Sequence, residues 1–98
     1  MFRRSRRDQC RQLLAQLLAD ERASAERRES LENERLAVFE ELRQLNSGGR
    51  LDVDQAAARR FFVGHLLGEI AAAKRNEQLV AQQVDLCRQA LREAEQDV

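Results

Sequence analysis

The sequence contains no proline, no tryptophan and no tyrosine, and only four glycines interrupt its 98 residues. Proline breaks helices and glycine weakens them, so long stretches without either are typical of long helices. Large aromatic residues fill most globular cores, but here four phenylalanines are the only aromatic side chains. A chain this short with so little bulk has a thin core, and we expect it to need a partner or a longer parent chain.

Neither sign of charge predominates, because 17 basic residues balance 17 acidic ones. Disorder is the competing class, but balanced charge and regular apolar spacing argue against it. The balance also gives no reason to expect the body of the chain to bind nucleic acid. The start is the exception, since Arg3, Arg4, Arg6 and Arg7 form a basic arm. Such an arm either binds phosphate, an acidic protein or a membrane face, or is a solvated helix start.

Long apolar runs are absent too, since no run approaches the ~20 residues of a membrane span. The basic start is not followed by the apolar core of a signal peptide, so we expect a cytoplasmic protein. Cys10 and Cys87 are too few and too far apart for a metal cluster. We expect free thiols, and a disulfide between them is the alternative if the helices shift slightly in register.

Candidate catalytic side chains are scarce. His65 is the only histidine, and no nucleophile or carboxylate is placed beside it by the sequence pattern. A lone histidine of this kind is usually solvated. We therefore expect no enzyme activity, no metal and no cofactor.

An apolar series with alternating steps of three and four residues runs through the second half of the chain. Ten of its eleven positions are apolar, the exception being Glu77, and the series is Val63, Leu66, Ile70, Ala73, Glu77, Val80, Val84, Cys87, Leu91, Ala94 and Val98. This is the heptad pattern of a coiled-coil helix. The pattern has not ended at the last residue, so we expect a fragment of a longer chain.

A weaker series of the same kind runs from residue 7 to residue 45 in the first half. It is apolar at both ends and polar between Glu21 and Arg28, which lies near the level of Glu77 on the second helix. A polar layer at that level can fix the register of the helices. The alternatives are that the helices splay there, or that a third helix covers the site.

The stretch NSGGRLDVDQ, residues 46–55, is the one clear interruption. Gly48 is a stop signal for the first helix, and Asp52 with Gln55 has the spacing of a capping box that starts the second. A flexible linker would need no such caps, so we predict a tight corner. The expected fold is all-α, a single domain over residues 1–98 with two long helices forming an antiparallel coiled-coil hairpin. Its helices cover about 5–47 and 53–98, and its corner covers 48–52.

A turn centred near residue 50 sets the pairing across this hairpin. It places Val38 opposite Val63, and it sets Phe39 opposite Phe62 in an expected aromatic contact. Gly64 and Gly68 would permit close approach of another helix beside Phe61 and Phe62. A short hinge between long helices can also open into a swapped homodimer, so the pairing is either within one chain or between two.

Three segments of the chain resemble the FliJ family of bacterial flagellar proteins: RRDQCRQLLAQLLADERAS, LRQLNSGGRLDVDQAAARRFFVGHLLGEI and VDLCRQALREAEQDV. The family has a long helix, a glycine-containing corner, and a second helix with an L-x-x-x-I step and a later V-x-x-x-R-x-x-L-x-x-A segment. Here these are Leu66 to Ile70, and then Val84, Arg88, Leu91 and Ala94. The chain departs from the family in its shorter basic-aromatic start and in ending before the charged C-terminal helix.

The resemblance implies a stalk-like component of the flagellar type III protein export apparatus, at most peripherally associated with the membrane. Its partners would be the hexameric export ATPase, the cytoplasmic domain of the export gate and the export chaperones. We assign partner binding to the basic arm and to Phe61 and Phe62, and structural roles to Gly48, Asp52, Gln55, Phe39 and Glu77. The alternative functions are a structural coiled coil that pairs two hairpins into a four-helix bundle, and a small regulator whose basic arm binds nucleic acid.

Overall fold

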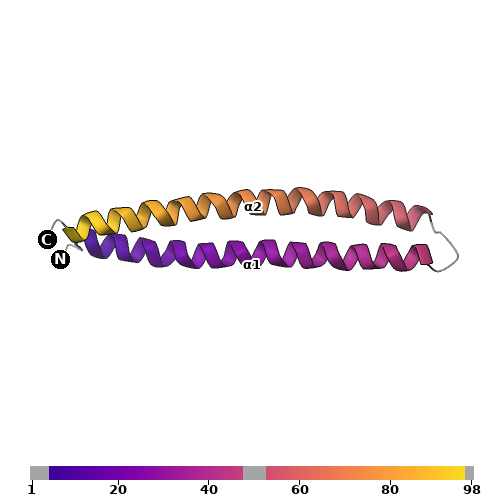
Figure 1. The fold of residues 1–98 in the computed structure, drawn as a ribbon, viewed down its shortest axis with the longest axis horizontal. Helices are drawn as coiled ribbons and strands as arrows, with labels where there is room; N and C mark the ends of the chain where they lie inside the picture. The colour runs from indigo at the N-terminus through magenta and orange to yellow at the C-terminus, as the bar shows by residue number, and fades with distance from the viewer. Residues whose placement is uncertain (1–4, 48–52, 97–98) are drawn as a thin grey trace. The chain divides into compact units, whose positions relative to one another are not determined.

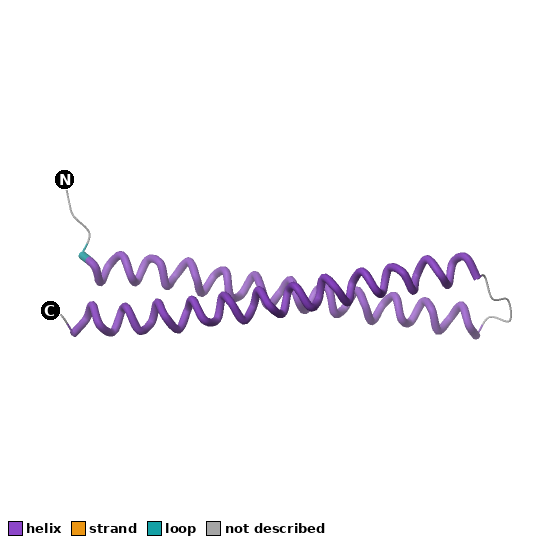
Figure 2. The backbone as a smooth tube through the Cα atoms, turned by 90° about the horizontal axis from the view of Figure 1, so that it is seen from above, coloured by secondary structure: helices purple, strands orange, loops and turns teal. Residues whose placement is uncertain are grey.

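The protein consists of two long helices in a computed structural model that describes residues 5–47 and 53–96. Helix α1 covers Arg6–Ser47 and helix α2 covers Val53–Gln96 (Figure 1). Ser5 is the only other described residue, and it precedes α1. Figure 2 shows that the described chain is helical almost throughout. The predicted all-α fold of two long helices is confirmed. The predicted corner, with Gly48 and Asp52, lies outside the described residues.

The chain divides into two compact units. Unit 1 contains Met1–Ala25 and Arg75–Val98, and unit 2 contains Glu26–Lys74. In unit 1, Arg11 contacts Glu95 and Ser24 contacts Asn76, so the α1 and α2 segments run in opposite directions. In unit 2, the contacts of residue 32 with residue 74 and of residue 41 with residue 59 give the same order. The two helices are therefore antiparallel in each unit, as predicted.

The core of unit 2 is a continuous apolar cluster between the two helices. Leu66 is 1% exposed at its centre. The cluster is formed by Leu31, Val38, Leu42, Ala56, Val63, Leu66 and Ile70, with Ala73 packed against it. These residues recur at the three- and four-residue steps that keep one side of a helix facing its neighbour. The two predicted apolar series meet along the line where the helices face each other, which we call the seam. In this unit the seam is the core.

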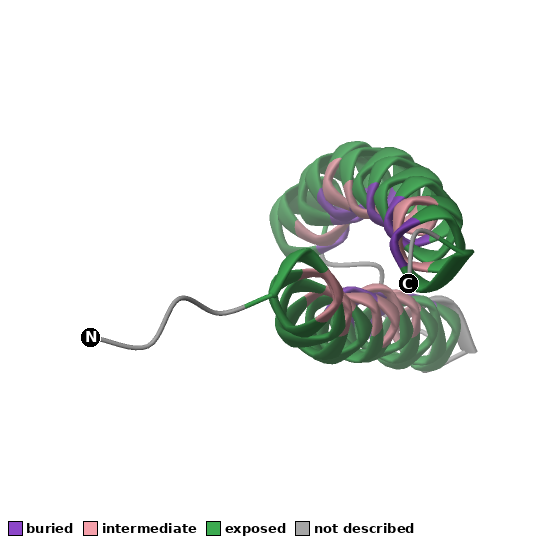
Figure 3. Ribbon diagram, turned by 90° about the vertical axis from the view of Figure 1, so that its left-hand side faces the viewer, coloured by how far each residue is buried: buried purple, intermediate pink, exposed green. Residues whose placement is uncertain are grey.

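The core of unit 1 is uneven. Its α2 segment buries Val80, Val84, Cys87 and Ala94. In the described part of its α1 segment, Ser24 is the only buried side chain, while Leu14 and Leu17 are half-buried. The buried and half-buried parts of the ribbon lie on the facing sides of the helices, and the outer sides are exposed (Figure 3). Most apolar burial in this unit therefore comes from α2.

Every described position of the two predicted series is buried or half-buried, including the polar ones. A residue's place in the repeat decides its burial more strongly than its own polarity does, because the spacing alone turns it towards the other helix. Within the described residues, neither helix has a stretch long and apolar enough to cross a membrane.

Candidate docking surfaces

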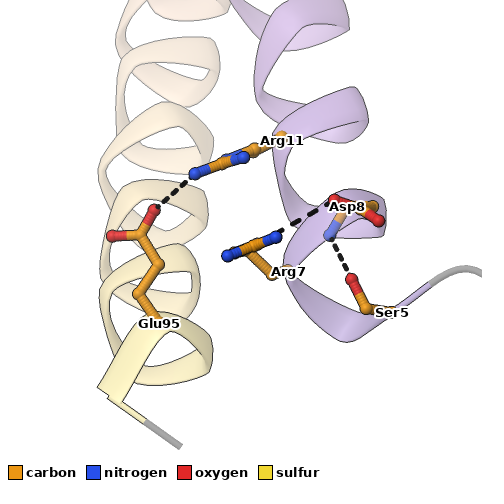
Figure 4. Close-up of polar contacts among 5 residues, drawn as sticks. All are labelled: Ser5, Arg7, Asp8, Arg11 and Glu95. Atoms are coloured by element: carbon orange, nitrogen blue, oxygen red, sulfur yellow. Dashed lines mark hydrogen bonds and ion pairs between the residues drawn. The ribbon is translucent and has the colours of Figure 1, made fainter. Parts of the chain in front are cut away.

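The first turn of α1 is organised by its own polar side chains. The Ser5 hydroxyl accepts a hydrogen bond from the backbone N–H of Asp8 at 3.2 Å (Figure 4). The Ser5 carbonyl accepts one from Gln9 N–H at 3.0 Å. Ser5 is therefore the N-cap of the helix. Sequence reasoning treated this region as a basic arm or a solvated helix start and did not identify the cap. The serine three residues before an acidic residue was the available signal.

The basic residues of this region do not form one free arm in the described part of the chain. Arg3 and Arg4 lie outside the described residues. Arg6 is exposed on α1, whereas Arg7 is half-buried. The Nε of Arg7 is shielded from solvent and lies 3.9 Å from Asp8 Oδ1 (Figure 4). Arg7 thus has its Nε beside Asp8 in the first turn of the helix, while 43% of its side chain is exposed.

A cross-helix ion pair lies one turn further along. The guanidinium of Arg11 is 3.3 Å from the carboxylate of Glu95, and it joins the start of α1 to the end of α2 (Figure 4). About half of each side chain is exposed, so solvent screens the pair and its contribution to stability is small. The ion pair shows which residues of the two helices are neighbours in unit 1.

A buried polar contact crosses the helices of unit 1. Ser24 is 7% exposed, and the side-chain amide of Asn76 donates a hydrogen bond to its hydroxyl at 3.0 Å. The sequence placed Glu77 at this level, and Glu77 is half-buried there. The partner of Ser24, however, is the neighbouring Asn76. The polar layer therefore contains a satisfied hydrogen bond, which removes the cost of burying the hydroxyl.

The two cysteines meet across the helices of the same unit. Both are free thiols, Cys10 half-buried and Cys87 buried. The Cys87 thiol lies 3.5 Å from the backbone carbonyl oxygen of Cys10, to which it donates a weak hydrogen bond. The sequence register places Cys87 opposite Leu14, one helical turn from Cys10.

In unit 2, Glu32 binds two cations. Its carboxylate is 2.9 Å from the guanidinium of Arg28 on the same helix and 3.6 Å from the ammonium of Lys74 on the other. Arg59 and Glu41 form a second cross-helix pair at 3.0 Å. Arg59 also donates to the backbone carbonyl of Gln55 at 3.5 Å. Gln55 is exposed in the first turn of α2, and its expected partner, Asp52, lies outside the described residues.

Phe39 and Phe62 lie in different hollows of unit 2. Phe39 lines one with Leu36, Glu40, Leu42, Arg43 and Arg60, and Arg35 lies over its ring at 5.6 Å from the centroid. Phe62 lines another with Glu34, Ala37, Val38, Glu41, Ala58 and Arg59. No ring contact joins the two phenylalanines among the described residues. The predicted aromatic contact is therefore wrong.

The reason is the handedness of the helices. Phe39 follows the seam residue Val38, and Phe62 precedes the seam residue Val63, so both rings lie at the same level. The step from Val38 to Phe39 and the step from Val63 back to Phe62 run in the same direction along the unit. Because both helices are right-handed, both steps rotate the side chain in the same sense about its helix axis. Because the helices face each other, the same rotation carries the two rings to opposite flanks. Matching levels alone cannot reveal this.

Phe61 is the most exposed large apolar side chain of the described residues, with 81% of its surface accessible. On the same side of α2, His65 Nε2 is 3.1 Å from the Glu69 carboxylate. Gly64 and Gly68 are exposed between them, and a side-chain carbon added at either would meet nothing within 4 Å. Phe61 and Phe62 are neighbours in sequence but lie in different surroundings.

The described residues bring together no group of three or more His, Cys, Asp and Glu that could hold a metal ion. What their side chains do offer is exposed apolar surface on a helical framework. The fold and these surfaces define the class of the protein as an antiparallel coiled-coil hairpin. Comparisons of the chain with protein-family models, curated proteins and solved structures found no match.

Proposed function

We propose that this chain is a non-enzymatic coiled-coil component of the flagellar type III protein export apparatus. It would act by docking its helices onto other proteins. The resemblance of its three segments to the FliJ family supports the apparatus. The observation that carries the docking role is the 81% exposure of Phe61, because a side chain of this size gains most from a partner that covers it.

The partners in this proposal are the export ATPase, the cytoplasmic domain of the export gate and the export chaperones. The protein would work in the cytoplasm, peripheral to the inner membrane at the flagellar base, and would contribute to assembly of the motility organelle. Phe61 and Phe62 would supply apolar contacts. Arg3, Arg4, Arg6 and Arg7 would supply charge to an acidic surface.

The test is a pull-down of the purified chain with the export ATPase and, separately, with the cytoplasmic domain of the gate. We expect capture of at least one, and weaker capture by the double variant F61A/F62A. The matched control is L79A/L86A, which likewise removes two exposed apolar side chains from α2. These two leucines are 58% and 66% accessible. Failure of the chain to bind either partner would rule out the proposed function.

A further inference from the structure

The hollow that contains Phe39, which we call the Phe39 hollow, lies on one flank of unit 2 and has a volume of about 550 Å³. Its apolar side chains include Leu36, which is 59% exposed, and Phe39, which is 45% exposed. Leu36, Phe39 and Arg43 follow one another at steps of three and four residues, so they form a line of about two turns on α1. A line of exposed apolar residues beside a second helix is a surface on which a further helix packs.

The charged side chains around the Phe39 hollow are mostly basic. Arg43 and Arg60 line it, and the guanidinium of Arg35 lies 5.6 Å from the centroid of the Phe39 ring. Glu40 is the only carboxylate among the described residues that line it, and it lies 2.8 Å from Arg43. Arg35 on α1 and Arg60 on α2 therefore leave a positive excess at this hollow.

The hollow that contains Phe62, on the opposite flank, has the opposite excess. Its described lining includes Glu34 and Glu41 but only one basic residue, Arg59. Arg59 is 3.0 Å from the Glu41 carboxylate, so the charge of Glu34 is left over. An acidic ligand is therefore attracted to the Phe39 hollow and repelled from the opposite one. The charges of unit 2 thus distinguish its two flanks.

Acidic ligands of this size are nucleic acids or acidic protein segments, and the Phe39 hollow favours protein. Leu36 and Phe39 offer apolar surface, which an apolar side chain of a partner covers favourably. A nucleic acid would gain from stacking a base on the Phe39 ring, but the Arg35 guanidinium already lies over that ring. Glu40 within the hollow also repels a phosphate backbone, in which every unit is charged.

We propose that the Phe39 hollow docks an acidic amphipathic helix of a partner protein. An apolar side chain of that helix covers Leu36 and Phe39, and carboxylates beside it meet Arg35 and Arg60. The hollow contains neither Phe61 nor Phe62 among its described lining residues. The site therefore goes beyond the proposed export role and does not depend on it.

Fluorescence anisotropy with a labelled synthetic peptide tests the proposal on the purified chain. The probe is a peptide of about five helical turns, with leucines at steps of three and four residues and glutamates at the positions beside them. We expect saturable binding that weakens as salt is added, since the arginines are exposed to solvent screening. A second probe has lysines in place of the glutamates.

Two variants of the hollow separate its apolar and charged contributions. F39A should weaken binding of the acidic peptide by about 10-fold, because an apolar contact is lost. R60E should weaken it by about 10-fold or more, because repulsion replaces attraction. The lysine peptide should lose no affinity for R60E.

Each variant has a matched control on α2, away from the hollow. R92E makes the same change of charge at an exposed arginine, and L86A removes an exposed apolar side chain. Both should bind the acidic peptide like the wild type. The helical circular dichroism of all four variants should match that of the wild type.

Three results would overturn the proposal. The first is a wild-type chain that does not bind the acidic peptide. The second is an equal loss of binding in R60E and R92E, which would mean that only net charge attracts the peptide. The third is a single-stranded DNA oligonucleotide that binds more tightly than the peptide and is released by R60E, which would make the hollow a nucleic-acid site.

Discussion

Ser24 is the only buried polar side chain of the described residues, and its hydroxyl accepts a hydrogen bond from Asn76. We predict that S24A is less stable than S30A by about 0.5–1.5 kcal/mol in urea unfolding. Both changes replace serine with alanine in α1, so both gain the same helix propensity. Only the first removes a buried hydrogen bond, because Ser30 is exposed. Equal stabilities for the two variants would show that the Ser24 bond contributes nothing.

The Cys87 thiol lies 3.5 Å from the backbone carbonyl oxygen of Cys10, and we predict that mild oxidation joins the two cysteines in a disulfide. With oxidised glutathione, the two thiols form one disulfide bond, and two reduced glutathiones take up the protons and electrons. The bond would close a loop of 77 residues and should stabilise the chain by about 4 kcal/mol.

Thiol titration and mass spectrometry measure this oxidation. We expect loss of both thiols, a chain lighter by two hydrogens, and a higher midpoint of urea unfolding. C10S is the control, because its remaining thiol has no partner within the chain. A wild-type chain that gives only mixed disulfides with glutathione would contradict the prediction.

At the scale of the elements, adjacent residues of α2 differ strongly in exposure, depending on whether they lie in the seam. Leu66 is 1% exposed and Leu67 is 47% exposed. We predict that L66A lowers the free energy of unfolding by about 2–5 kcal/mol, since it leaves a cavity in the core of unit 2. L67A should cost less than about 1 kcal/mol. Urea unfolding of both variants measures the difference, and similar losses would mean that the helix is rotated about its axis.

The seams were predictable from the sequence because burial follows the three- and four-residue steps. The prediction reached even polar positions, such as half-buried Glu77 and Arg7. It failed for Phe39 and Phe62, because pairing by level ignores the rotation of a side chain around its helix. The choice of Asn76 as the partner of Ser24 depends on the same rotation. The spacing of apolar residues therefore predicts which residues are buried in the core. It does not predict which residues meet on the flanks of the two helices, where the candidate docking residues lie.

For the whole molecule, the pairing of α1 with α2 of its own chain can be tested in solution. Glu41 and Arg59 make a 3.0 Å ion pair in unit 2. In a variant with C10S and C87S, we expect cysteines at positions 41 and 59 to be joined by a short bifunctional crosslinker within one chain. The product should run as a monomer on a denaturing gel, even from a concentrated sample. A crosslinked dimer that forms in dilute solution would indicate exchanged helices.

The buried Ser24–Asn76 contact also limits how the helices can slide. A repeating apolar seam looks nearly the same after a shift of seven residues, or about 10 Å along a helix. Such a shift would move the Ser24 hydroxyl away from Asn76 and towards apolar side chains of α2, at a cost of about 1–3 kcal/mol for an unpaired buried group. The cost of leaving the buried Ser24 hydroxyl without a hydrogen bond therefore opposes a seven-residue shift of α1 along α2 in unit 1. Replacing Ser24 by an apolar residue would make the neighbouring alignments more nearly equal in energy.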